Sequence, residues 1–190
     1  MYASGEDFNI DQSLRFEDGD DPYLSFTPSS AGNRQKWVLS FWMKRGNLTR
    51  SSVFCQQVDN SNIAIIKIDV DKVEIKEFTS GMDYQMATTA VLRDPSAWYH
   101  ILISFDTTQA TDTNRIQIYI NGEKHTSFST TNYPDEDYNG LINTAAEHYI
   151  GSRFDGSGGS TPYKPMDGYL AEMHFIDKTG SGSEWFTAND

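Results

Sequence analysis

Two polar loops carry the residue types that bind sugars. Sugar rings present flat C–H faces that pack on aromatic side chains, and hydroxyls that carboxylates, amides or guanidinium groups can orient. The candidate ligand-binding residues are Tyr133, Asp135, Asp137, Tyr138 and Asn139 in the first loop, and Arg153, Asp155 and Tyr163 in the second. The alternative is that the tyrosines pack over a sheet edge or contact a neighbouring subunit.

Acidic side chains offer a second chemistry. Calcium is a hard cation that takes several carboxylate and carbonyl oxygens. The acidic run 17–21 and more distant carboxylates supply the candidate metal ligands, which are Asp18, Asp20, Asp21, Asp155 and Asp167. None of these runs has the spacing of an EF-hand, and acidic loops are usually only solvated. We therefore expect no obligatory cofactor, and calcium stays an open alternative.

The sequence lacks the patterns typical of catalysis. It has no Gly-x-Ser-x-Gly elbow and no glycine-rich loop that opens a helix. The histidines, His100, His125, His148 and His174, form no zinc-type pair four residues apart. The single cysteine, Cys55, lies in an apolar run and is expected to be a small buried hydrophobe. We expect no catalytic residues and a protein that is not an enzyme.

Strands must position these loops. Tyr99, Ile101, Ile103 and Phe105 alternate with more polar residues, which predicts a strand with one buried face. A second alternating run ends at Asn121-Gly122, a strong hairpin signal. The same reasoning predicts further strands at 13–16, 23–26, 36–44, 52–58, 62–68, 72–78, 126–131, 147–152 and 168–176. Because each strand must bury one face, the chain is expected to be all-β, with two stacked sheets.

Three segments are predicted in more detail. The strand at 36–44 is apolar on both faces, which indicates a central strand. The stretch 153–166 is rich in Gly, Ser and Pro and is expected to be an exposed loop, and 183–189 could form one helical turn. Residues 1–12 are polar and are expected to be a flexible or docking arm, followed by one domain over 13–190.

Charge limits the partners. The formal net charge is −12 over 190 residues, with a pI near 4.6. A polyanion would be repelled, so we expect no nucleic-acid partner. No apolar run is long enough for a membrane span, and the first residues do not resemble a signal peptide. Synthesis in a cytoplasm and no membrane insertion are therefore expected.

Several motifs together resemble the laminin-G-like, concanavalin A-type lectin/glucanase superfamily. They are Trp37-Val-Leu-Ser-Phe-Trp-Met-Lys44, Trp98-Tyr-His-Ile101, Ile118-Tyr-Ile-Asn-Gly122, His148-Tyr-Ile-Gly151 and Asp167-Gly-Tyr-Leu-Ala-Glu-Met-His-Phe-Ile-Asp177. The phrases at 28–34, 93–100 and 105–110 are similar to laminin-G-like domains of marine bacteriophage tail-fibre and virion structural proteins. The resemblance implies a jelly-roll sandwich of two antiparallel sheets, binding rather than turnover, and a virion setting.

The resemblance also allows the chain to be compared with enzymes of the same superfamily. Glucan-cleaving relatives carry a Glu-x-Asp-x-x-Glu pattern on one strand. Glu74-Ile-Lys-Glu77 departs from this pattern, and Glu74 is expected on a solvated strand face.

Two functions follow as hypotheses. The first is a lectin-like adhesin module of a tail or capsid fibre that binds host-surface glycan. The alternative is a purely structural capsid or tail decoration protein that binds other virion proteins and no sugar. Either role implies a virion location, other virion proteins as partners, and a homo-oligomer in the particle, because weak single sites gain strength from multiple copies.

Overall fold

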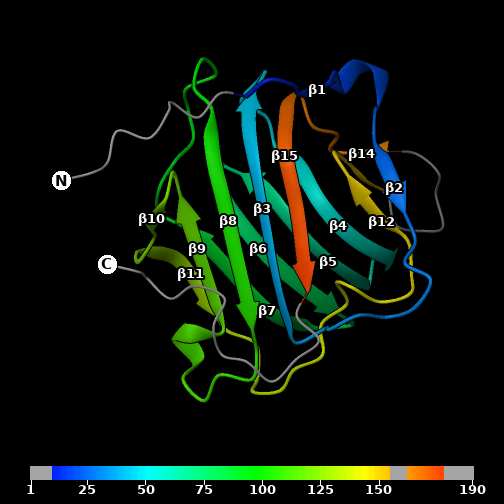
Figure 1. Cartoon of the computed structure of the whole chain (residues 1–190), viewed down its shortest axis with the longest axis vertical. Helices are drawn as coiled ribbons and strands as arrows, with labels where there is room; N and C mark the ends of the chain where they lie inside the picture. The colour runs from blue at the N-terminus through cyan, green and yellow to red at the C-terminus, as the bar shows by residue number, and fades with distance from the viewer. Residues whose placement is uncertain (1–9, 155–161, 178–190) are drawn as a thin grey trace.

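The strands with alternating side chains form two sheets, of which the first has six strands. The computed structural model describes residues 10–154 and 162–177. In the six-stranded sheet, antiparallel neighbours follow the order β1 (Leu14–Phe16), β15 (Gly168–Asp177), β3 (Lys36–Arg45), β8 (Tyr99–Asp106), β9 (Ile116–Ile120) and β10 (Glu123–Lys124). Figure 1 shows β15, β3 and β8 side by side in the layer nearer the viewer. The central place predicted for the strand at 36–44 is confirmed.

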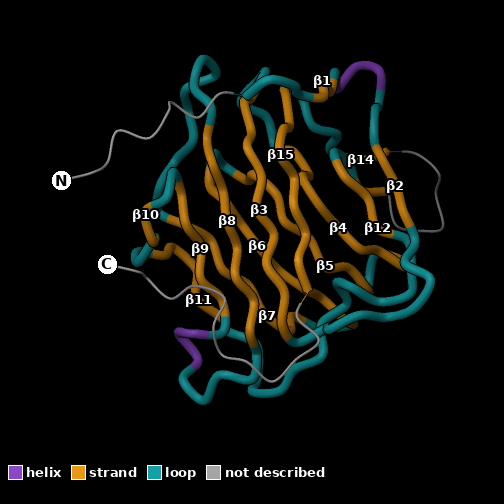
Figure 2. The backbone as a smooth tube through the Cα atoms, in the orientation of Figure 1, coloured by secondary structure: helices purple, strands orange, loops and turns teal. Residues whose placement is uncertain are grey.

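The second sheet has seven strands and lies behind the first (Figure 1). Its order is β11 (Phe128–Asn132), β7 (Met82–Thr88), β6 (Lys72–Thr79), β5 (Asn62–Asp69), β4 (Ser51–Asp59), β12 (His148–Ile150) and β2 (Leu24–Phe26). A separate pair is formed by β13 (Arg153–Phe154) and β14 (Pro162–Tyr163). The helical content of the described chain is two 3-10 turns, η1 (Asp18–Asp20) and η2 (Asp112–Asn114), as Figure 2 shows.

The core lies between the facing sides of the sheets. From β3, the side chains of Trp37, Leu39, Phe41 and Met43 are all buried in it. Trp37 stacks on Phe105 of β8 with ring centroids 4.8 Å apart. The seven-stranded sheet contributes a row of paired inward residues, which are Phe54, Ile66, Ile75 and Met86. An all-β sandwich of two antiparallel sheets results, as the sequence predicts.

Register fixes what the outer face of the seven-stranded sheet displays. Next to the inward row, Cys55 of β4 pairs with Ile65 of β5, and Ile65 pairs with Lys76 of β6. Side chains alternate between the two faces of a strand, so these residues point away from the core. Cys55 is fully buried, as predicted, and burial raises the pKa of its thiol to about 12.

Some expectations need correction. The sequence reasoning missed β7, although Tyr84 and Met86 alternate there with polar residues. The insertion 153–166 is not only a loop, because its two ends pair as β13 and β14. The arm residues 1–9 and the predicted helical turn at 183–189 lie outside the described residues. No helix in the described ranges is both long and apolar enough to cross a membrane.

Candidate functional site

A short hairpin stands beside the outer face of the seven-stranded sheet. In this hairpin, Arg153 pairs with Tyr163 and Phe154 pairs with Pro162. The Gln57 side chain of β4 fixes it, since its Nε2 donates to the Phe154 carbonyl (3.0 Å) and its Oε1 accepts from the Phe154 amide (3.1 Å). Gln57 lies two residues after Cys55 and shares its face. The hairpin is therefore attached to the outer side of the sheet.

One side of this hairpin carries an aromatic cluster. Phe154 contacts Tyr149 of β12 and Tyr23, with ring centroids 4.6 and 5.1 Å apart. Tyr149 is in register with Cys55, so it also projects from the outer face. The Tyr149 hydroxyl donates to Glu147 at 2.9 Å, and Tyr23 is 42% exposed. These rings provide a partly exposed aromatic surface at the edge of the sheet.

A second ring surface carries positive charge. The Arg153 guanidinium lies over the Tyr163 ring, 4.5 Å from its centroid, and the Lys164 ammonium lies 5.1 Å from the same centroid. Such cation–π contacts hold a cation and a ring in one unit. Tyr163 is 37% exposed. The structure therefore brings together two of the predicted ligand-binding residues, while the third in that stretch, Asp155, lies outside the described residues.

The sheet beside the hairpin is charged. Lys67 of β5 forms ion pairs with Glu74 (3.0 Å) and with Asp69. Burial lowers the pKa of Lys76, and the positive charges of Lys67 and Arg153 lower it further. The expectation that Glu74 is solvated was wrong: it is only 7% exposed, because it packs in this row against Lys67. Sequence reasoning also missed Lys67 and Lys76, whose alternation with apolar residues is typical of any strand.

The other predicted loop is bound to the end of the sandwich. Tyr138 donates its hydroxyl to the fully buried Glu77 (2.6 Å), and Arg34 donates to the carbonyls of Asn139 (2.9 Å) and Gly140 (2.6 Å). The Gln35 side chain donates to the Asp137 carbonyl at 2.7 Å. Tyr138 is thus directed into the protein rather than outward.

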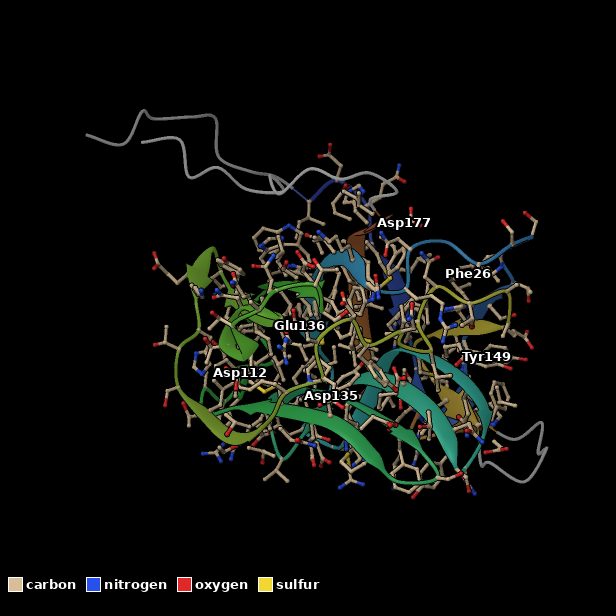
Figure 3. All side chains as sticks on the ribbon, turned by 90° about the horizontal axis from the view of Figure 1, so that it is seen from below. Phe26, Asp112, Asp135, Glu136, Tyr149 and Asp177 are labelled. Atoms are coloured by element: carbon tan, nitrogen blue, oxygen red, sulfur yellow. The ribbon has the colours of Figure 1, made fainter. Side chains whose placement is uncertain are left out.

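The exposed part of this loop is acidic. The side chains of Asp135, Asp137 and Asn139 are exposed and Tyr133 is half-buried. Figure 3 shows Tyr149 toward the right-hand side of the molecule and Asp135 near the middle of the view, apart from it. The two predicted binding stretches therefore belong to different parts of the surface.

The two glutamates of β6 cannot act as a catalytic pair. Glu74 lies on the outer face, whereas Glu77 points into the core, where it also accepts from the Tyr84 hydroxyl (3.2 Å). A retaining or inverting glycosidase needs two carboxylates that flank one bond. These two lie on opposite sides of the sheet.

Three carboxylates meet near the start of β15. One oxygen each of Glu17, Asp18 and Asp167 lies within 4.8 Å of the others. Partial burial raises the pKa of Asp167, and the charges of Asp18 and Glu17 raise it further. Asn47 donates to Asp18 at 2.9 Å. Arg15, which pairs with Glu17 at 2.6 Å, offsets part of the negative charge, and the cluster remains a set of hard oxygens of the kind that calcium binds. Of the other predicted ligands, Asp20 and Asp21 are exposed and outside the cluster, and Asp155 is not described.

We expect calcium to raise the thermal unfolding midpoint by several degrees at saturating concentration. A ligand that binds only the folded state at about 100 times its Kd stabilises it by about 2.7 kcal/mol. Asp167→Asn removes one carboxylate and should abolish the rise, while Asp20→Asn, outside the cluster, should keep it. Differential scanning calorimetry in EDTA and in calcium measures this. Equal midpoints for the unmodified chain in both buffers would contradict the site.

The sequence itself matches a family model. Residues 18–184 match the model described as the concanavalin A-like lectin/glucanases superfamily. The fold defines the same class of protein, because it is a two-sheet lectin-type sandwich. The chain belongs to this superfamily. A search of curated protein sequences gave no match.

Solved structures share the fold at low identity. The SAP-like pentraxin of Limulus polyphemus is 15% identical (TM-score 0.57), with 88% of this chain and 73% of that one covered. Domain 4 of the Geobacillus stearothermophilus arabinanase AbnA, in complex with arabinotriose, is 20% identical (TM-score 0.53; 78% and 63% covered). A Ruminococcus gnavus sialidase CBM40 bound to α2,3-sialyllactose is 12% identical (TM-score 0.54; 85% and 94% covered). These likenesses concern the fold alone.

Proposed function

We propose that this chain is a non-catalytic carbohydrate-binding domain. Its ligand lies on the outer face of the seven-stranded sheet, beside the β13–β14 hairpin. The observation that carries the proposal is the exposed Tyr163 ring with the Arg153 guanidinium stacked on it. A ring for the C–H face of a sugar and a cationic donor beside it are the groups that a saccharide needs.

Three further observations support the proposal. Phe154 of the same hairpin forms a second ring surface with Tyr23 and Tyr149, which lie beside it. Glu74 and Glu77 lie on opposite faces of β6, which agrees with binding without hydrolysis. Among the proteins with this fold, the arabinanase domain was solved with arabinotriose and the CBM40 domain with sialyllactose.

The biological setting that we propose is a virion. The phrases at 28–34 and 93–100 are similar to virion laminin-G-like domains, and a net charge of −12 keeps the protein soluble at high local concentration. The domain would then be an adhesin module of a tail or capsid fibre, present in several copies and contacting other virion proteins and host-surface glycan.

One observation favours a second candidate, a structural decoration protein. Leu14, Leu24 and Phe26 are 55%, 45% and 42% exposed, and they lie on β1 and β2, at the outer edges of the two sheets. Exposed apolar residues at strand edges are typical of contacts with another chain. In this role the purified domain would bind no glycan.

A glycan array tests the proposed binding site. We expect the unmodified chain to bind a subset of glycans and Tyr163→Ala to weaken that binding by about tenfold or more, since it removes both the ring and the support of Arg153. Tyr133→Ala, in the other predicted loop, serves as the matched control and should bind as the unmodified chain does. Loss of binding with Tyr133→Ala but not with Tyr163→Ala would move the site to the loop at 133–139. Absence of any glycan binding would overturn the proposal.

A further inference from the structure

Lys76 is a partly buried cation that no carboxylate contacts directly within the described residues. It lies on β6, inside the seven-stranded sheet, paired across the strands with Ile65 and Gln85. Within residues 10–154 and 162–177, its ammonium makes no hydrogen bond and no ion pair, and the carboxylates of Glu74 and Asp69 attract it only at longer range. Its neighbour Lys67 differs, because Glu74 and Asp69 neutralise it. Partly buried charges are normally paired. Lys76 therefore holds three unused donors over the outer face.

Arg153 brings a second unpaired cation to the same area. The Cys55 thiol donates to the Ser152 carbonyl at 3.4 Å, which places the start of β13 over the outer side of β4. Cys55 is separated from Lys76 by only one strand, β5. The guanidinium lies on Tyr163 and makes no ion pair within the described part of the chain. The Arg153 guanidinium repels the Lys76 ammonium and contributes to the lowered pKa of Lys76.

The positive charge of this area contrasts with the rest of the chain. Lys67, Lys76, Arg153 and Lys164 gather around the hairpin and its side of the sheet, although the net charge of the protein is −12. Glu74 and Asp69 offset the charge of Lys67, and Arg50 also pairs with Asp69. A neutral sugar would not need this excess. A bound anion would relieve the repulsion among the cations and would satisfy their free donors.

We infer that the saccharide is anionic and that Lys76 and Arg153 bind its acid group, while Tyr163 packs on its ring. The inference rests on the proposed function and narrows its ligand class. A carboxylate of a sugar acid and a sulfate ester offer the same chemistry, an oxyanion that accepts charge-assisted hydrogen bonds. The positions of the two cations do not favour one over the other.

Matched saccharide pairs test the inference with the full chain. The probes are oligogalacturonates and their methyl esters, carrageenan oligosaccharides and their desulfated forms, and 3′-sialyllactose and lactose, on one array. We expect the acidic member of at least one pair to bind at least tenfold more tightly than its neutral partner. The carboxylate and sulfate pairs distinguish the two sources of the anion. The preference should weaken as salt rises.

Two variants assign the preference to residues. Lys76→Met and Arg153→Gln should each reduce binding of the acidic member about tenfold, to near that of its neutral partner. Lys124→Met, an exposed lysine on β10 of the other sheet, is the matched control and should keep the preference. Thermal midpoints equal to that of the unmodified chain would show that the variants are folded.

The outcomes separate the two proposals. Equal binding of acidic and neutral members would overturn the anionic ligand and leave a carbohydrate-binding domain. An acid preference unchanged in both variants would overturn the assignment to Lys76 and Arg153. Binding of no saccharide in any pair would overturn the inference together with the proposed function.

Discussion

Glu77→Ala is expected to lower the free energy of unfolding by about 3–5 kcal/mol. Glu77 is fully buried and accepts hydrogen bonds from the hydroxyls of Tyr138 (2.6 Å) and Tyr84 (3.2 Å) and from the Leu141 amide (3.0 Å). Its loss leaves these three donors without an acceptor inside the sandwich and releases the loop at 133–141. Urea denaturation measures the change.

Two controls isolate the buried network. Tyr138→Phe removes one donor and should cost about 1 kcal/mol. Glu123→Ala, an exposed glutamate on β10, should change stability by less than about 0.5 kcal/mol. A cost for Glu77→Ala as small as that for Glu123→Ala would show that the network does not hold the loop.

Glu77 should also give stability a pH dependence. Burial raises its pKa above the ordinary value of 4.5, so the folded chain binds this proton more tightly than the unfolded chain does. The resulting stabilisation is fully present below pH 4.5 and is lost as pH rises through the raised value. In Glu77→Gln this component is absent, so the stability of the unmodified chain relative to the variant should increase as pH falls. Parallel pH curves for both proteins would contradict the raised pKa.

Gly168→Ala is the second change with a large expected effect, a loss of about 3–5 kcal/mol. Gly168 begins β15 with a φ of +137°, and an added Cβ would lie 2.1 Å from the Lys44 carbonyl oxygen and 2.8 Å from the Gly46 amide nitrogen. Both contacts are with backbone that cannot rotate away. The substitution must therefore separate β15 from β3 where they pair, next to Asp167.

Two other glycines serve as controls that distinguish the cost of the Cβ clash at Gly168 from the cost of a positive φ. Gly122 has a φ of +83° but open space around its Cβ position, so Gly122→Ala should cost only about 1–2 kcal/mol. Gly81 has open space as well and is not among the positive-φ glycines, so Gly81→Ala should be near neutral. Chemical denaturation of the three variants measures these losses in unfolding free energy, and we expect the largest for Gly168→Ala and the smallest for Gly81→Ala. Equal losses at Gly168 and Gly122 would mean that the strands move apart without cost.

The sequence was sufficient for most strands because a period of two is local. Residues 99–105 show their buried face without reference to any other segment, and the strand is present. β7 was missed because Met82, Met86 and Ala87 are not among the β-branched and aromatic residues that are enriched in strands, so Tyr84 is a lone strong signal in its middle.

The candidate site was only partly predictable, because it depends on contacts between distant segments. Residue type alone singled out Arg153 and Tyr163, which do meet. The inward direction of Tyr138 depends on Glu77, 61 residues away in the chain, and no local pattern indicates that partner. Lys76 looks like any polar strand residue until the fold places Arg153 nearby.

The most direct test of the account is an NMR titration of the ¹⁵N-labelled chain with the saccharide that binds most tightly on the array. We predict shifts of the Arg153 Nε–H resonance and of the amides of Lys76 and Tyr163, with little change in the loop at 133–139. Shifts confined to that loop, or to the outer face of the six-stranded sheet, would contradict a binding site beside the β13–β14 hairpin.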